Sequence, residues 1–374
     1  MRLFLRHEQA LRTFYSSRFK PLHIPTTETT VAEQLKSGGY QTMSAGKWHC
    51  SGDFDSGVQP YPGDHGFDHW LAHKSNFGRN PEGFLRNGQQ TGQLEGWMSE
   101  IVVDEAMSWL DQRNKDIPFF TCLWFREPHT PVQAADECRA LYPADEIAPH
   151  EKALATSGGS QVVRKKLKDP DLYFGCVSML DHHIGRLLDY LDKHNLADNT
   201  IIIFTSDNVP EHRTATAFGS WGHLRGAKGH VHDGGMHVPG IIRWPGGIKA
   251  GSVSDEPING TDWLPTLSAV AGVGLSMGRP IDGANVLPAA LHGQPVHRPR
   301  PMLWWLYHAE PRRVLSHRLH SGVFGSLTNF TAFRIAGPHR GFLREVRSCV
   351  LEVPETAADQ PWQYSSFPMD PLSD

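Results

Sequence analysis

Residues 201–208, Ile-Ile-Ile-Phe-Thr-Ser-Asp-Asn, hold the most hydrophobic run of the chain and end on a carboxylate next to an amide. Consecutive isoleucines followed by a phenylalanine favour a β-strand that is buried on both faces. A polar pair directly after such a strand lies at the carboxyl edge of a sheet, where α/β proteins bind their ligands. The stretch therefore predicts an α/β fold and makes Asp207 and Asn208 candidate site residues.

Helices and strands alternate on both sides of this strand. A long helix is expected over residues 169–195, with an apolar stripe at helical spacing formed by Val177, Leu180, Ile184, Leu187, Leu188 and Leu191. A capping box from Thr30 to Glu33 predicts a short helix that stops at Gly38-Gly39, and residues 97–112 and 263–272 are expected to be helical, the latter capped by Thr261 and Asp262. Further strands are expected at 40–46, 118–125 and 237–246. This alternation predicts a central, mostly parallel sheet flanked by helices.

Two regions are expected. Residues 1–308 carry the alternating pattern and are expected to form one α/β domain, whereas residues 309–374 lack lysine and clear periodicity and are expected to form a small, irregular C-terminal region. Charged residues make up 20% of the 374 residues and the formal net charge is -4, which argues against disorder and gives no reason to expect nucleic acid as a partner. No apolar run approaches a membrane span, and residues 1–12 are too charged for a signal peptide. The five cysteines form no CxxC pair, so neither a disulfide framework nor a zinc cluster is expected.

Charged or titratable side chains follow three of the expected strands, and a fourth group comes from the glycine-rich loop 224–235. The candidates are Lys47, His49, His129, Asp207, Asn208 and Lys228. Taken singly, Lys47 could be a solvated loop lysine, His129 a turn histidine between prolines, and Asp207 a turn cap. Taken together, two lysines, two histidines and two oxygen donors suit an anionic tetrahedral group beside a hard divalent cation. We expect the candidates to meet in one cleft.

Several longer segments resemble the sulfatases of the alkaline phosphatase superfamily, especially bacterial carbohydrate sulfatases. The resemblance runs from about Ile24 to about Trp305 and rests on the segments TTVAEQLKSGGYQTMSAGKWH, HGFDHW, EPHTP, LADNTIIIFTSDN, LRGAKGHVHDGGMHVPGIIRWPG and TDWLPTLSAVAG in this order. It implies an alkaline-phosphatase-like fold, hydrolysis of sulfate esters of carbohydrates, a calcium ion and a formylglycine nucleophile.

The same resemblance implies a role for each candidate. Asp207 and Asn208 correspond to two of the calcium ligands, and Lys47 and Lys228 to the lysines that hold the sulfate oxygens. His129 corresponds to the histidine that protonates the leaving-group oxygen, and His49 to the histidine beside the catalytic aldehyde hydrate, where it acts as a base. These residue types suit the reaction, because S–O cleavage needs charge stabilisation on the sulfuryl group and a proton for the departing alkoxide.

The sequence departs from the family at the nucleophile. Formylglycine is made from Cys or Ser in a C/S-x-P/A-x-R motif upstream of the GKWH segment; Cys122 to Arg126 has the right end residues, but Trp124 stands where Pro or Ala belongs. The family's first strand, with its paired metal-binding aspartates, is also missing; Val209 replaces a usual glycine and His237 a usual arginine. The chain is therefore expected to be an N-terminally truncated sulfatase, inactive as given and weak in calcium binding.

Two other readings stay open. The first is a phosphomonoesterase or phosphodiesterase of the same superfamily, for which His230 and His232 could be offered as zinc ligands; Asn208 favours the sulfatase, because the phosphoesterases place a histidine after the aspartate. The second is a non-catalytic binder of sulfated glycans that keeps the anion site without the nucleophile. The sugar, the sulfate position, the oligomeric state and the localisation are left open, although members of the family are often exported.

Overall fold

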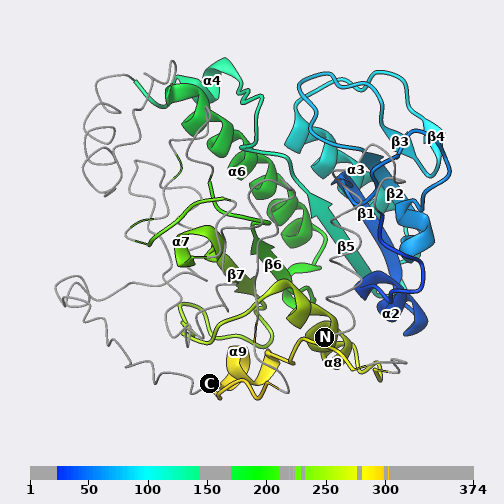
Figure 1. The fold of residues 1–374 in the computed structure, drawn as a ribbon, viewed down its shortest axis with the longest axis vertical. Coiled ribbons are helices and arrows are strands. Elements are labelled where there is room, and N and C mark those ends of the chain that lie inside the picture. Colours follow the sequence, from blue (N-terminus) through cyan, green and yellow to red (C-terminus); the bar gives the residue numbers. More distant parts are fainter. Residues whose placement is uncertain are drawn as a thin grey trace, which may run out of the picture.

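The structure is a computed structural model that describes residues 23–143, 170–210, 219, 222, 224–228, 232–275, 280–298 and 302. It contains a five-stranded sheet in the order β4-β3-β2-β1-β5 and a two-stranded sheet of β6 and β7 (Figure 1). The strands are β1 (Gln41–Lys47), β2 (His69–His73), β3 (Leu85–Arg86), β4 (Gln89–Gln90), β5 (Phe119–Trp124), β6 (Ile202–Thr205) and β7 (Gly240–Arg243).

The predicted parallel arrangement is found around β1, which lies between β2 and β5 and runs parallel to both. Ser44 of β1 stands opposite Trp70 on one side and Cys122 on the other. The pairs β2–β3, β3–β4 and β6–β7 are antiparallel, so the described part of the fold is a mixed sheet. Since β1 and β5 run the same way, their carboxyl ends meet at one edge.

Helices flank the five-stranded sheet, and α3 packs on β1, β5 and α6. In the same view α6 runs diagonally between α4 and β6 (Figure 1). The helices are α2 (Val31–Ser37), α3 (Met98–Gln112), α4 (Asp136–Arg139), α6 (Pro170–Lys193), α7 (Asp233–Met236), α8 (Trp263–Val270) and α9 (Leu287–His292), with short 3-10 turns at Pro62–His65, Ala197–Asn199 and Gly260–Asp262. None of the described helices is long and apolar enough to cross a membrane.

The core lies between the sheet and α3. Met43, Leu71, Phe84, Met98 and Val102 are buried in one cluster, which fixes the sheet against this helix. Gly46 permits the closest approach within the sheet, because a Cβ at this position would lie 2.1 Å from the Trp124 backbone oxygen and the residue has φ +114°. Only glycine fits such a position without displacing a strand. β1 and β5 therefore deliver their last residues side by side.

The capping box of α2 is confirmed: the Glu33 backbone N–H donates to Thr30 Oγ1 (3.1 Å) and the Thr30 N–H donates to Glu33 Oε2 (2.7 Å). Of the two residues predicted to cap α8, Asp262 is its N-cap residue, without a side-chain hydrogen bond to the helix, and Thr261 is not. Asn259 Oδ1 accepts from the Thr261 N–H (2.9 Å), and Asp262 Oδ2 accepts from the Asn259 N–H (2.8 Å). These bonds cap the 3-10 turn that precedes the helix.

Two predictions of burial are also corrected. The residues of β5 and the first three of β6 are half-buried rather than buried on both faces, because β5 is the edge of its sheet and β6, among the described strands, pairs with β7 alone. On α6 the buried face is centred on Cys176, Met179, Leu180 and His183, so Val177, Ile184 and Leu188 lie beside it. Residues 309–374, and the boundary predicted before them, fall outside the described residues.

One polar network connects β2 and β3 to α3. Glu105 of α3 accepts from Arg86 Nε (2.8 Å) and Nη2 (2.7 Å), and its Oε1 lies 2.7 Å from His69 Nε2. Burial raises the pKa of Glu105, but the hydrogen bonds from His69 and Arg86 outweigh burial and hold it at about 2, below its ordinary 4.5.

This network predicts an acid-dependent loss of stability. A carboxyl group whose pKa is depressed in the folded state stabilises the fold above its unfolded pKa, and that contribution is lost as the pH falls toward the folded pKa. Glu105→Gln should therefore lower the free energy of unfolding by about 2 to 3 kcal/mol at pH 7, and the difference from wild type should shrink between about pH 4.5 and pH 2. Urea unfolding at several pH values measures it, with exposed Glu95→Gln as the matched control. A Glu105→Gln deficit that is equal at pH 7 and pH 3 would contradict the prediction.

Candidate functional site

Lys47 is the last residue of β1 and stands at the carboxyl edge of the sheet. The chain turns directly after it: the Trp48 N–H donates to the His73 carbonyl (2.8 Å) and His49 has φ +46°. Burial lowers the pKa of Lys47, Asp207 raises it, and Lys228 and Arg126 lower it further. Lys47 is therefore within electrostatic range of Asp207, Lys228 and Arg126.

His49 is subject to the same group of charges. Burial lowers its pKa, as do Lys47, His129 and Lys228, whereas Asp207 raises it. The charges of four other candidates, Lys47, His129, Asp207 and Lys228, therefore all act on His49. Net positive surroundings favour the neutral imidazole at His49 at pH 7. A neutral imidazole can accept a proton.

Asp207 and Lys228 are connected through the backbone. The Lys228 N–H donates to the Pro210 carbonyl (3.2 Å), which brings the glycine-rich loop onto the turn that follows β6. In that turn Ser206 Oγ donates to the Asn208 carbonyl (2.8 Å); Asp207 is exposed and Asn208 is half-buried. This single contact explains why two segments about twenty residues apart in sequence supply charges of opposite sign to one place.

His129 lies in the turn that follows β5. Its N–H donates to the Arg126 carbonyl (2.9 Å), and its ring Nδ1 lies 2.8 Å from the Thr130 carbonyl oxygen and 3.0 Å from Asn76 Nδ2. The ring is half-buried. It is thus held on one nitrogen, and the other nitrogen is left for the site.

Arg126 and Glu127, which precede His129 in this turn, are both buried. Arg126 is 2% exposed; its Nη1 lies 2.6 Å from Met98 Sδ and its Nη2 donates to the Pro131 carbonyl. Glu127 Oε1 accepts from the Ser99 N–H (2.7 Å) in the first turn of α3, where the helix dipole favours a negative charge. Burial lowers the pKa of Arg126 and raises that of Glu127, and the pair stays partly compensated because each charge acts on the other. Arg126 is therefore a buried cation that acts electrostatically on Lys47.

Two residues that contact or influence the candidates, Arg126 and Asn76, were not predicted from the sequence. Arg126 had a usable signal, because it follows a predicted strand directly, as Lys47 does. Asn76 had none, because its contact with His129 joins residues 53 positions apart.

The oxygen donors offer little for a metal ion. Calcium takes about six to eight oxygen ligands, and Asp207 and Asn208 contribute one side chain each. No group of three or more His, Cys, Asp or Glu residues able to hold a metal ion occurs in the part of the chain that the structure describes. His230 is outside the described residues, and His232 is exposed at the start of α7. These donors alone do not fit a calcium site, and no catalytic step is assigned to a metal.

This donor set predicts weak calcium binding. Titration calorimetry on the 374-residue chain should give a dissociation constant of about 10⁻³ M or weaker, because water can fill coordination positions but adds no charge. Asp207→Asn should abolish the remaining heat, and exposed Asp255→Asn should leave it unchanged. Tight stoichiometric binding by the wild type would reveal ligands beyond Asp207 and Asn208.

Cys122, the residue with the nearest match to a nucleophile motif, is unsuited to that role. It lies within β5 in register with Ser44, and burial raises the pKa of its thiol to about 12. A thiol with so high a pKa is not ionised at neutral pH, so it is inert as a nucleophile.

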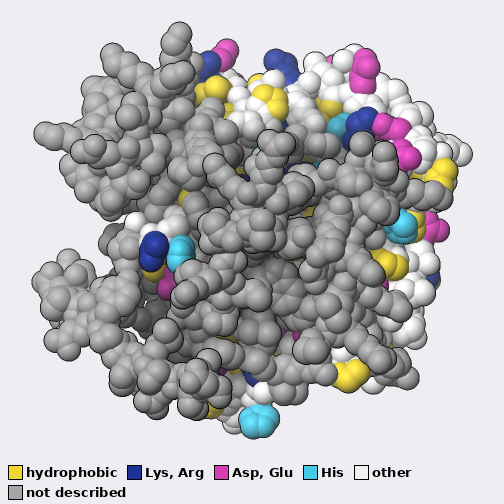
Figure 2. Space-filling view, in the orientation of Figure 1, with side chains coloured by type: hydrophobic (Ala, Val, Ile, Leu, Met, Phe, Trp, Pro, Cys, Tyr) yellow, Lys and Arg dark blue, Asp and Glu magenta, His cyan; other side chains and the backbone are white. Residues whose placement is uncertain are grey.

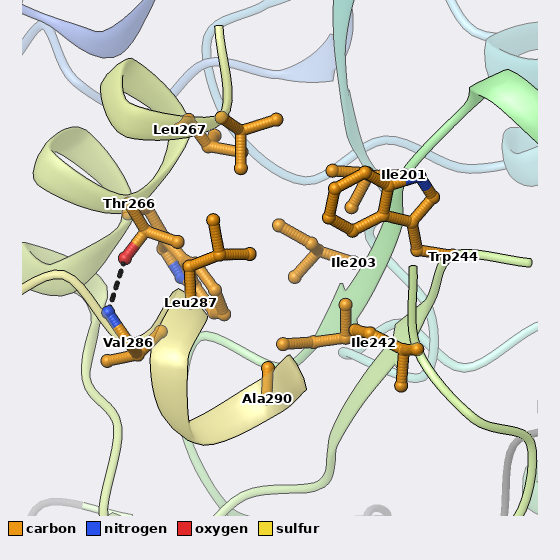
Figure 3. Close-up of a pocket in the computed structure, with 12 residues that line it drawn as sticks. Ile201, Ile203, Ile242, Trp244, Thr266, Leu267, Val286, Leu287 and Ala290 are labelled. Atoms are coloured by element: carbon orange, nitrogen blue, oxygen red, sulfur yellow. Dashed lines mark hydrogen bonds between the residues drawn. The ribbon is translucent and has the colours of Figure 1, made fainter. Parts of the chain in front are cut away.

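A small cavity of about 20 Å³ lies elsewhere, between β6, β7, α8 and α9 (Figure 3). Apolar side chains such as Ile203, Ile242 and Leu287 point into it, and Thr266 Oγ1 is occupied by the Val286 N–H (3.0 Å). None of the six candidates lines it. The charged site is therefore distinct from the apolar cavity.

Among the described side chains visible in Figure 2, acidic and basic groups are interspersed rather than gathered by sign.

Known proteins resemble the chain over most of its length. A family model described as Sulfatase matches residues 7–273. Human N-acetylgalactosamine-6-sulfatase is 29% identical over 297 residues, which cover 74% of this chain and 51% of that protein. The arylsulfatase of Hemicentrotus pulcherrimus is 26% identical over 292 residues, 72% of this chain and 47% of that protein. The crystal structure of Ps i-CgsB in complex with k-i-k-neocarrahexaose is 26% identical with a TM-score of 0.63, covering 76% of this chain and 62% of that chain. The chain spans about half the length of the curated relatives it matches.

Proposed function

The chain belongs to the sulfatase family of the alkaline phosphatase superfamily, and we propose on that basis that its site recognises sulfate esters of carbohydrates. Its mixed central sheet with flanking helices is the fold of that superfamily. The observation that supports the proposal is the influence of Lys47, His129, Asp207 and Lys228 on the pKa of His49, together with that of Asp207 and Lys228 on the pKa of Lys47. Three strand ends and one loop supply these groups.

In this proposal each residue has a separate task. Lys47 and Lys228 hold the sulfate oxygens, since two ammonium groups compensate the charge that develops on a sulfuryl group. His129 gives a proton to the ester oxygen of the leaving alcohol, and His49, with its lowered pKa, takes one. Arg126 adds positive charge from beneath the site without contacting solvent. The name of one relative, N-acetylgalactosamine-6-sulfatase, refers to a sulfated sugar, which supports a carbohydrate as the alcohol part of the ester.

The lack of a nucleophile motif in these residues motivates a second proposal, in which the chain as given binds sulfated glycans without hydrolysing them. In relatives, formylglycine supplies a covalent intermediate; in these 374 residues no Cys or Ser is followed by Pro or Ala two positions later and Arg four positions later. Without that group, electrostatics and positioning remain. Turnover and binding therefore have to be measured separately.

Binding tests the proposed site directly. In titration calorimetry with a sulfated monosaccharide, Lys47→Ala and Lys228→Ala should each weaken binding by about 10- to 100-fold, because each removes a hydrogen bond to a charged group worth about 1.5 to 3 kcal/mol. Exposed Lys249→Ala is the matched control and should bind as the wild type does. Equal affinity of all four proteins would refute the site, and tighter binding of the corresponding phosphate ester would favour a phosphoesterase.

A further inference from the structure

We propose that Asn76 is a positioning residue for His129, and that together with the Thr130 carbonyl it keeps the proton of the neutral ring on Nδ1. The catalytic meaning of this inference rests on the proposed function, in which Nε2 serves the leaving group. The hydrogen-bond pattern itself is independent of it. Three contacts involve Nδ1: the Thr130 carbonyl oxygen at 2.8 Å, the Asn76 carboxamide at 3.0 Å and, at the longest distance, Thr130 Oγ1 at 3.4 Å, a hydroxyl that can donate or accept.

The Thr130 contact indicates which nitrogen is protonated. A backbone carbonyl oxygen has no hydrogen to donate, so a 2.8 Å contact with it is a hydrogen bond only when Nδ1 carries the proton. The neutral ring is then the Nδ1–H tautomer, with its lone pair on Nε2.

The proton on Nδ1 also determines which atom of the Asn76 carboxamide faces the ring. Nδ2 would present a second donor to Nδ1–H, while Asn76 Oδ1 is buried without a hydrogen-bond partner. A half-turn of the carboxamide exchanges the two atoms and makes Oδ1 a second acceptor for Nδ1–H. We assign this orientation, because it relieves the donor–donor contact and uses the orphaned oxygen.

The loop that carries Asn76 is itself held in place. The Arg79 N–H donates to Gln133 Oε1 (2.9 Å), the Gly96 N–H donates to Asn80 Oδ1 (2.8 Å), and the Arg79 guanidinium lies 4.8 Å from the centre of the Trp97 ring. Asn76 therefore meets His129 from a fixed position, and little order has to be created when the contact forms.

The consequence concerns Nε2. Within the described residues no hydrogen bond is made to this atom, so it is the ring position open to a ligand. When the ring is protonated, Nε2–H can pass its proton to the oxygen of a departing alcohol, and the ring returns to the neutral Nδ1–H form without rotating. A ring that exchanged tautomers freely would present the wrong nitrogen part of the time.

Long-range ¹H–¹⁵N spectra of the full chain labelled at histidine test the inference in the neutral form of the ring. His129→Gln identifies the His129 signals by their loss. In the wild type, the nitrogen coupled to both ring carbon-bound protons, Nε2, should be unprotonated. In Asn76→Ala both ring nitrogens should shift toward their average, and in Asn76→Asp the Nδ1–H form should persist, because a carboxylate is an acceptor only. Asn199→Ala, an exposed asparagine at the end of the 3-10 turn after α6, is the matched control and should keep the wild-type signals.

The outcomes separate this inference from the proposed function. An Nε2–H tautomer in the wild type, a tautomer reversed by Asn76→Asp, or wild-type signals in Asn76→Ala would each overturn it. A titration of the wild type with the sulfated monosaccharide tests the proposed function instead. If His129 shows the Nδ1–H form but no sulfate ester binds, the positioning contact stands and the assigned function fails.

Discussion

Purified as 374 residues, the chain should show no release of sulfate from aryl and carbohydrate sulfate esters at an enzymatic rate. The lysines and histidines can bind and polarise a sulfate, but they supply no atom for the covalent step that divides hydrolysis into two easier reactions. Enzymes stripped of a nucleophile lose about 10⁴- to 10⁶-fold in turnover and keep a residue of catalysis from positioning and electrostatics. We expect the turnover of this chain to lie below that of a sulfatase with its nucleophile by a factor of that size.

A sulfate-release assay measures it, with the arylsulfatase of Hemicentrotus pulcherrimus, a relative named for this activity, setting the scale. Lys249→Ala serves as the matched control for the removal of a lysine charge. Multiple-turnover release by the wild-type chain that disappears in Lys228→Ala but not in Lys249→Ala would contradict the prediction. It would also mean that a water activated by His49 or His129 replaces the missing nucleophile.

The second large effect is on stability and concerns Asp262, which is fully buried. Its Oδ1 accepts from the Ala284 N–H (2.8 Å) and Arg298 Nη1 (2.8 Å), and its Oδ2 accepts from the Asn259 N–H (2.8 Å) and Arg298 Nη2 (3.0 Å). One carboxylate thus joins the start of α8 to two later segments. Asp262→Ala should lower the free energy of unfolding by about 3 to 5 kcal/mol, because it strands the charge of Arg298 and two backbone N–H groups.

Urea unfolding followed by circular dichroism checks this, with exposed Asp255→Ala as the control. The double variant Asp262→Ala/Arg298→Met is the sharper comparison: it removes the stranded cation as well and should recover part of the loss. A double variant less stable than Asp262→Ala would show that Arg298 stabilises the fold through contacts other than this ion pair.

The elements that the sequence predicts well are those with local signals. The capping box fixes the start of α2, and helical spacing of apolar residues marks α3 and α6. β2, β3 and β4 went unpredicted, since His69–His73 begins and ends on histidine and the other two strands are two residues long. Pairing with neighbours, rather than local preference, makes these segments strands.

The site divides in the same way. Lys47, His49, His129 and Asp207 could be predicted because polar residues directly follow expected strands. The structure has Lys47 and His129 after β1 and β5 of one sheet, and Asp207 after β6 of another. Asn76 and the half-buried state of β6 could not be predicted, because they depend on which distant segment packs against them. The catalytic and metal-binding roles of the candidates remain predictions.

The Arg126–Glu127 pair has a consequence for how such a site diversifies. The segment before His129 is held on the first turn of α3, through Ser99 and Met98. Insertions or replacements in outer loops can therefore change the surroundings of His129, the proposed acid, while its backbone keeps its position. Lineages that change sugars are expected to vary the loops freely and to retain a buried arginine and glutamate beneath them.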